Sequence, residues 1–278
     1  MDQPAQHLAT SRVSGNMPGT LLVDSDGPAV TRRVYGRVLP AALVCDHASA
    51  AIPAALGNLG LSREHRLRHI AWDIGAARLA DRMAQRLRLP LVLSGYSRLV
   101  IDCNRRLDDP GSILSVSDAV SIPGNQAMTE ADREARASEV FKPYHEAIEL
   151  ELRDCARLAE APALIAVHSF TECYGGKDRP WHCGVLWDRD PRLAQPMLQA
   201  LRAEPALVVG DNEPYSGRHP ADYTIDVHAE RRGWPHLCLE IRQDLLQTEE
   251  GIDEWAARLC AALAPLLADE KLYRTADC

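Results

Sequence analysis

The sequence predicts a single α/β domain of three layers, in which a mixed, mostly parallel sheet is covered by helices on both faces. Short apolar runs alternate with longer segments of helical periodicity along most of the chain. No internal repeat, low-complexity tract or proline-rich linker divides this pattern. The 278 residues and their 46% hydrophobic content are also sufficient for one substantial core.

Seven apolar runs predict the strands of this sheet. They cover residues 41–46, 91–94, 98–102, 163–168, 183–187, 206–210 and 236–241. Residues 1–35 mix Ser, Gly, Pro and Thr with one short apolar patch, which predicts a flexible or surface-wrapped N-terminal arm. The folded domain is therefore expected over residues 36–270.

Start signals and apolar stripes place the helices. Asp73 is expected to cap a helix whose apolar residues repeat every four positions up to Leu87. A second helical stretch opens at Thr129, with a kink or new first turn where Pro143 occurs. Further helices are expected over residues 191–203, 222–232 and 251–268. Residues 106–128 lack any sustained period, which is typical of a binding loop or lid.

Composition excludes several classes of protein. The net charge of −8 argues against nucleic-acid binding, which requires a basic surface to neutralise phosphates. No apolar run approaches the roughly 18 residues that cross a bilayer, and the N-terminus lacks the apolar core of a signal peptide. The eight cysteines are scattered, with no Cys-x-x-Cys pair. This usage predicts reduced thiols in a cytoplasmic protein.

Two histidines indicate a metal site. His47 and His168 each lie where an apolar run ends, and the carboxyl ends of parallel strands meet in one crevice. A catalytic zinc needs a third protein ligand and keeps one position for water. Asp73 is the best candidate, since a carboxylate at a helix start would face the same crevice. The alternatives are that Asp73 only caps the helix and that nearby His69 is the ligand.

Glu240 is the candidate catalytic base. It lies inside the apolar run 236–241, where a carboxylate is costly unless it is paired or functional. It would take a proton from the attacking water and return it to the leaving nitrogen. The alternative is a buried ion pair with Arg242.

The segment around residues 98–105 predicts an anion clamp. Arg105 follows an apolar run directly and Asn104 adds an amide donor, so both are candidates for holding a substrate carboxylate. Arg98 and Arg242 are weaker candidates for a second carboxylate or for the developing oxyanion. The turn-rich loop with Asn212 and Tyr215 either contacts the substrate or simply reverses the chain.

Several separated motifs, in this order, resemble the N-formylglutamate amidohydrolase family. The similarity runs from Ala42 to Leu267. Its most specific parts are Asp46-His47-Ala48-Ser49 with Pro53, His69 to Gly75, Ser97 to Arg105, Pro143 to His145, Val167 to Phe170, Asn212 to Ser216 and Glu240 to Asp244.

This resemblance implies a fold like that of zinc carboxypeptidases and aspartoacylases, with one Zn²⁺ per chain. It implies that His47 and His168 hold the metal, that Asn104 and Arg105 bind the substrate carboxylate, and that Glu240 is the general base. The implied reaction is hydrolysis of N-formyl-L-glutamate, or of a related acidic N-acyl amino acid, to formate or another acid and the amino acid. For the family, this is a step of histidine catabolism.

Two other hypotheses stay open at this stage. One is a non-catalytic protein that binds an acidic small molecule on the same scaffold. The other is a hydrolase with a cysteine nucleophile, Cys103 or Cys173, paired with a histidine. The oligomeric state is not determined by the sequence.

Overall fold

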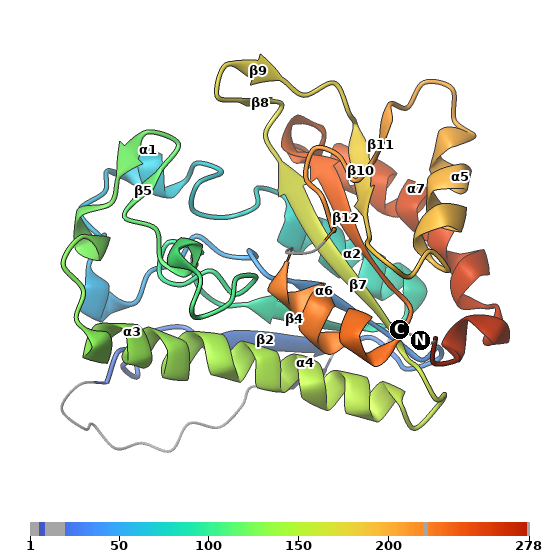
Figure 1. The fold of residues 1–278 in the computed structure, drawn as a ribbon, viewed down its shortest axis with the longest axis horizontal. Coiled ribbons are helices and arrows are strands. Elements are labelled where there is room, and N and C mark those ends of the chain that lie inside the picture. Colours follow the sequence, from blue (N-terminus) through green and yellow to red (C-terminus); the bar gives the residue numbers. More distant parts are fainter. Residues whose placement is uncertain (1–5, 9–19, 219–221, 277–278) are drawn as a thin grey trace.

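One sheet organises the molecule (Figure 1). The structure is a computed structural model that describes residues 6–8, 20–218 and 222–276. Across the sheet the strands are β1 (Gln6–Leu8), β2 (Val30–Val34), β4 (Pro90–Ser94), β3 (Ala41–Cys45), β7 (Ala163–Phe170), β12 (His236–Arg242), β10 (Cys183–Leu186) and β11 (Val209–Asp211). Two short hairpins stand apart from it, β5 (Val116–Ser117) with β6 (Val120–Ser121) and β8 (Cys173–Tyr174) with β9 (Lys177–Asp178).

The centre of the sheet is parallel. Strands β4, β3, β7 and β12 are parallel neighbours, whereas β2 and β10 run antiparallel to β4 and β12. Every residue of β3 and β7 is buried, as expected for strands covered on both faces. The predicted mixed, mostly parallel sheet is therefore confirmed, and the carboxyl ends of its central strands meet at one edge.

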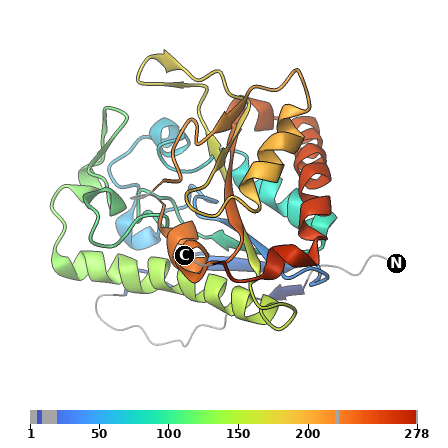
Figure 2. The ribbon, with the colours of Figure 1, turned by 45° about the vertical axis from the view of Figure 1, so that its right-hand side comes forward.

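Helices cover both faces of the sheet (Figures 1 and 2). The helices are α1 (Arg63–Arg66), α2 (Ala76–Leu87), α3 (Glu130–Arg136), α4 (Lys142–Cys155), α5 (Ala194–Arg202), α6 (Tyr223–His228) and α7 (Glu249–Leu267). Helices α2, α5 and α7 share one core with Leu43 and Ile165, whereas α4 shares the other with Val44 and Ala166. Successive strand residues thus alternate between two cores. None of the described helices is both long and apolar enough to span a bilayer.

The long helical stretch begins as predicted. Thr129 caps α3 through a capping box with Asp132. A π-helical turn over Ala137–Phe141 then leads into α4, whose first turn contains Pro143. The proline lies where the π-helical turn passes into α4, a place where the regular i to i−4 hydrogen-bond pattern is already interrupted.

The prediction of a flexible or surface-wrapped N-terminal arm is wrong for residues 20–35. Strand β2 lies within residues 1–35 and pairs with β4, and Leu21 and Leu22 are buried in the core beside α4. The backbone amides of both leucines donate to the carboxylate of Glu139. Residues 1–5 and 9–19 of the predicted arm lie outside the described residues.

The predicted strand over 98–102 is also wrong, because these residues form a buried turn. The carbonyl of Leu99 accepts from the Asn125 amide at 2.9 Å, and that of Val100 accepts from the Arg136 guanidinium at 2.9 Å. Side chains therefore satisfy backbone groups that a neighbouring strand would otherwise pair. The strand expected over 206–210 is shifted to β11 at 209–211.

Candidate active site

Three predicted metal ligands meet at the carboxyl end of the central strands. His47 follows β3, His168 lies in β7, and Asp73 lies in the loop before α2. One donor atom from each residue lies within 4.8 Å of the other two, and all three residues are buried. Asp73 Oδ2 is 3.3 Å from His47 Nδ1 and 2.8 Å from His168 Nδ1. Tetrahedral zinc ligands lie roughly 3.3 Å apart, so this spacing fits one ion.

The other nitrogen of each imidazole faces a carboxylate. His47 Nε2 lies 2.7 Å from Asp102 Oδ1, and His168 Nε2 lies 2.9 Å from Asp46 Oδ2. When each Nε2–H donates to its carboxylate, each Nδ1 is left with a lone pair directed at Asp73. In that protonation state three electron-rich atoms converge in a buried space, and either a metal ion or a second proton on each imidazole relieves their repulsion. Against the cost of burial, contacts with Asp102 and Asp73 raise the pKa of His47. Contacts with Asp46 and Asp73 likewise raise the pKa of His168, so protons take this role in the metal-free form. The donor set therefore fits a divalent metal ion such as Zn²⁺.

No supporting carboxylate was assigned to either histidine from the sequence. Asp46 is a partner of His168 on the neighbouring strand, not of adjacent His47, and it also accepts from Tyr144 and Thr224. Asp102, which lies within the segment of the predicted anion clamp, holds His47. These pairings cross between elements far apart in sequence, so local spacing could not identify them.

Asp73 is placed by a turn and not by a helix cap. Helix α2 begins at Ala76 after Gly75, and no side chain caps it, so the predicted N-cap role is wrong. The Asp73 backbone nitrogen donates to the His47 carbonyl at 3.0 Å, which ties the two ligand segments together. Gly75 has a φ of +85°, and a Cβ there would lie 2.5 Å from Leu246 Cβ. Only glycine permits this turn without strain.

Asp102→Asn is expected to weaken zinc affinity by about 10- to 100-fold, the usual cost of losing an outer carboxylate partner. The amide still accepts from His47 but no longer carries the charge that also pairs with Arg98 at 2.6 Å. Competition with a fluorescent chelator measures the affinity. Asp108→Asn on the same loop removes an exposed carboxylate and is the matched control. Equal affinities for the two variants would show that Asp102 does not support the metal.

Glu240 faces the same centre from the adjacent strand. Its backbone pairs with His168 in the register of β12 and β7. It is 5% exposed, and its Oε2 has no hydrogen-bond partner among the described residues. Burial raises the pKa of Glu240 to about 8. The nearby His168 lowers this pKa in part, and the negative charge of Asp73 raises it further. The alternative prediction, a buried ion pair between Glu240 and Arg242, is wrong because Arg242 pairs with Asp244 at 2.8 Å.

A pocket of about 400 Å³ opens onto these groups. Asn104, Arg105 and Tyr215, predicted to contact substrate, line it together with the three metal-ligand candidates and Glu240. The amide oxygen of Asn104 accepts from the Thr224 backbone at 2.9 Å, which leaves its NH₂ group as the available donor. The Arg105 side chain is 38% exposed and has one carboxylate, Asp222, at 3.8 Å.

Three other predicted substrate contacts have different partners. Arg98 lines the pocket but forms a two-pronged ion pair with Asp102. Arg242 and Asn212 are not among the described residues that line the pocket. The Asn212 side-chain oxygen accepts from the backbone nitrogens of Trp187 and Gly217, so this residue organises the chain reversal. Sequence reasoning missed Asp222, Phe170 and Tyr174, which also line the pocket.

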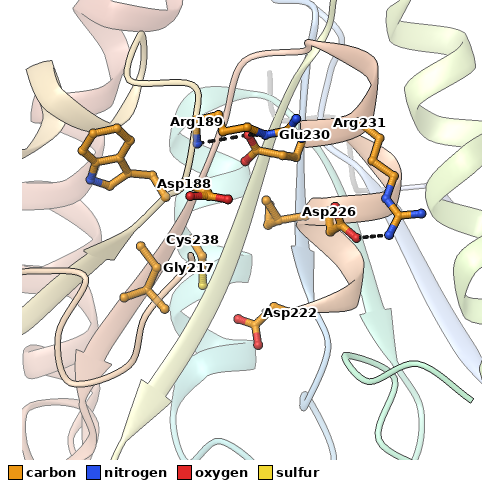
Figure 3. A pocket seen from close by; sticks show the side chains of 11 residues that line it. Asp188, Arg189, Gly217, Asp222, Asp226, Glu230, Arg231 and Cys238 are labelled. Atoms are coloured by element: carbon orange, nitrogen blue, oxygen red, sulfur yellow. Dashed lines mark hydrogen bonds and ion pairs between the residues drawn. The ribbon is translucent and has the colours of Figure 1, made fainter. Parts of the chain in front are cut away.

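A second cavity of about 410 Å³ adjoins the site through Asp222, which lines both (Figure 3). Leu186 and Cys238, paired across β10 and β12, contribute apolar wall. Its charged residues are partly neutralised by the pairs Arg189–Glu230 and Arg231–Asp226, drawn as dashed lines in Figure 3. This cavity contains none of the candidate metal ligands.

Comparison with known proteins decides the family. The sequence model of the N-formylglutamate amidohydrolase family matches residues 39–247. The chain belongs to this family. The predicted resemblance is thereby confirmed, and membership in the N-formylglutamate amidohydrolase family supports an enzyme that hydrolyses amide bonds.

Solved structures agree with this assignment to the N-formylglutamate amidohydrolases. The crystal structure of a gene product from Agrobacterium tumefaciens is 33% identical, with a TM-score of 0.85 over 90% of this chain and 99% of that one. N-formylglutamate amidohydrolase from Ralstonia eutropha JMP134 is 20% identical, with a TM-score of 0.68 over 88% of this chain and 98% of that one. The second likeness shows the shared fold. No curated protein matches the chain significantly.

The cysteine-nucleophile alternative has little support in this member of the N-formylglutamate amidohydrolase family. All seven described cysteines are free thiols. Cys103 is buried, and burial raises its pKa well above the usual range, which disfavours the reactive thiolate. Cys173 is exposed on β8 and is not among the described pocket residues.

A buried histidine pair predicts how stability depends on pH. His145 Nδ1 lies 2.9 Å from His228 Nε2, and burial lowers the pKa of each imidazole to about 4. Because the unfolded histidines titrate near 6.5, the unfolded state binds more protons as the pH falls from about 6.5 to 4. The free energy of unfolding should therefore drop by up to about 1.4 kcal/mol per pH unit for each histidine.

Urea unfolding at pH 7 and pH 5 measures this effect. His228→Gln removes one titrating group, so its loss of stability between the two pH values should be smaller than that of the wild type. His65→Gln, which replaces a partly exposed histidine on α1, is the control and should leave the difference unchanged. An undiminished difference in His228→Gln would contradict the prediction.

Proposed function

We propose that the chain hydrolyses the amide bond of N-formyl-L-glutamate or a closely related acidic N-acyl amino acid. Water is consumed, and formate (or the corresponding acid) and the free amino acid are released. The observation that carries this proposal is the convergence of His47, Asp73 and His168 beside Glu240, whose Oε2 has no partner among the described residues. Membership in the family and the pocket of about 400 Å³ support a small substrate.

One zinc ion bound by His47, Asp73 and His168 would supply Lewis acidity toward the amide carbonyl. Asp46 and Asp102 hold the two imidazoles in orientation and fix the proton on each Nε2. Imidazole and carboxylate donors suit zinc, and the same donor set also accepts other divalent metal ions.

Glu240 moves the proton in this mechanism. Its Oε2, which has no described partner, accepts a proton from the attacking water. The protonated carboxyl then donates that proton to the nitrogen as the bond between the carbonyl carbon and nitrogen breaks. A raised pKa suits this role because the carboxyl must both gain and lose the proton near neutral pH.

Arg105 and Asn104 orient the substrate. The guanidinium of Arg105 is partly exposed to the pocket and binds a carboxylate through two N–H groups. The Asn104 NH₂ adds a third donor, since its oxygen is held by the Thr224 backbone. Holding the carboxylate fixes the amide relative to Glu240, which lowers the entropic part of the barrier.

A panel of N-acyl amino acids tests the proposal, with zinc content measured in the same preparations. Zinc-loaded protein should release formate and L-glutamate in equal amounts from N-formyl-L-glutamate, and chelation should abolish the release. Binding of acidic amino acids without hydrolysis of any panel member would instead indicate a non-catalytic binding protein.

A further inference from the structure

The hairpin of β8 and β9 places one further arginine at the site. It directly follows β7, the strand that carries His168, and Figure 1 shows it projecting beyond the end of that strand. Arg179 comes immediately after β9, and its backbone nitrogen donates to the Glu172 carbonyl at 2.8 Å. This bond closes the base of the hairpin, so the position of Arg179 is tied to the strand that carries a candidate metal ligand.

Aromatic rings hold the Arg179 side chain. Its guanidinium carbon lies 4.8 Å from the Tyr215 ring centre, 4.9 Å from that of Tyr174 and 5.9 Å from that of Phe170. Arg179 Nη1 also donates to the Tyr215 hydroxyl at 2.9 Å. All three aromatic residues line the pocket of the metal-ligand candidates. Cation–π contacts therefore hold the guanidinium against three residues that line this pocket, while Arg179 itself is not among the described lining residues.

The Arg179 guanidinium is not neutralised by a described carboxylate, unlike those of two predicted anion-binding arginines. Arg98 and Arg242 each form two-pronged ion pairs, with Asp102 and Asp244. For Arg179, no carboxylate oxygen of the described residues lies within 4.0 Å of its guanidinium nitrogens. A stacked guanidinium with unused N–H donors is a ready partner for a carboxylate.

We propose that Arg179, together with Tyr215, binds the second carboxylate of a dicarboxylic N-acyl amino acid and so determines the preference for acidic substrates. The inference rests on the function proposed above, in which Arg105 and Asn104 hold the first carboxylate. Because the Tyr215 oxygen accepts from Arg179, its own O–H can donate to the same carboxylate. Two donors from two loops then recognise one anionic group.

The test compares an acidic substrate with its neutral isostere. Arg179→Gln should lower kcat/KM for N-formyl-L-glutamate by on the order of 10- to 100-fold, mainly through KM, because a charged hydrogen-bonded partner is lost. The same variant should change kcat/KM for N-formyl-L-glutamine little. Arg179→Lys keeps the charge but lacks the planar, two-pronged guanidinium. Its kcat/KM for N-formyl-L-glutamate should therefore lie between those of the wild type and of Arg179→Gln. Arg78→Gln, which removes an exposed arginine of α2, is the matched control.

An equal loss for both substrates would overturn the assignment and indicate that Arg179 only supports the hairpin. Failure of the proposed function gives a different result, namely a wild type that hydrolyses neither compound. In that case, calorimetric titration with L-glutamate and L-glutamine decides the role of Arg179. Weaker binding of L-glutamate alone to Arg179→Gln supports the assignment. Unchanged affinity, or no binding of L-glutamate by the wild type, refutes it.

Discussion

Glu240→Gln is expected to lower kcat by about 10³-fold, within the range that a general base contributes. The amide has the size of the carboxyl group but cannot accept the proton from water. Glu240 lies beside His168 in the strand register, and its Oε2 holds no other side chain or backbone group of the described residues in place. The loss should therefore appear in kcat, with zinc content unchanged. Steady-state kinetics and metal analysis of the same preparation measure both.

The metal-free form of this variant gives an independent readout. The pKa of the Glu240 carboxyl is about 8 in the folded protein and 4.5 in the unfolded chain. The free energy of unfolding therefore decreases as the pH rises from 4.5 through 8. Glutamine does not titrate, so Glu240→Gln should lose less stability over this range than the wild type. Glu249→Gln replaces an exposed carboxylate at the start of α7 and should match the wild type in both measurements. Wild-type turnover in Glu240→Gln would exclude Glu240 as the base.

Asp73→Asn is expected to have the second large effect, the loss of metal binding and with it of activity. Asp73 Oδ2 contacts both imidazoles, and the substitution removes the single negative charge among the three candidate ligands. Burial alone would raise the pKa of Asp73, but His47 and His168 hold it below its usual range. The carboxylate is thus ionised and able to bind a cation. Zinc affinity should fall by more than the roughly 100-fold upper range for outer partners.

Zinc content after dialysis, measured by atomic absorption, tests this expectation. Asp253→Asn removes a half-exposed carboxylate of α7 that pairs with Arg82 and is not among the candidate metal ligands, so it should retain the metal. Full zinc content in Asp73→Asn would leave His47 and His168 as the protein ligands and would require a different third ligand.

The candidate ligands were predictable because their signals are local. His47, His168 and Glu240 each interrupt or end an apolar run, and a polar side chain at such a place is costly unless it is used. Strand polarity then brings the ends of β3 and β7 to one edge. The structure accordingly places the His47 and His168 ring centres 5.1 Å apart.

The supporting residues were not predictable from local patterns. Asp102 lies in a segment whose apolar residues suggested a strand, whereas it forms a turn held by Asn125 and Arg136. Arg179 lies in a short polar hairpin that resembles any surface turn. Its neighbours Phe170 and Tyr215 are distant in sequence, so only the folded chain reveals the cluster.

The amino-acid sequence by itself determined the layered fold, its parallel centre and the identity of the central polar residues, because periodicity and burial cost act within a few neighbouring positions. The tertiary structure decided which carboxylate orients each imidazole, which arginines are already neutralised and which remain available to a substrate. Those properties depend on distances of about 3 to 4 Å between segments that are far apart along the chain, where electrostatic and hydrogen-bond energies change steeply with position.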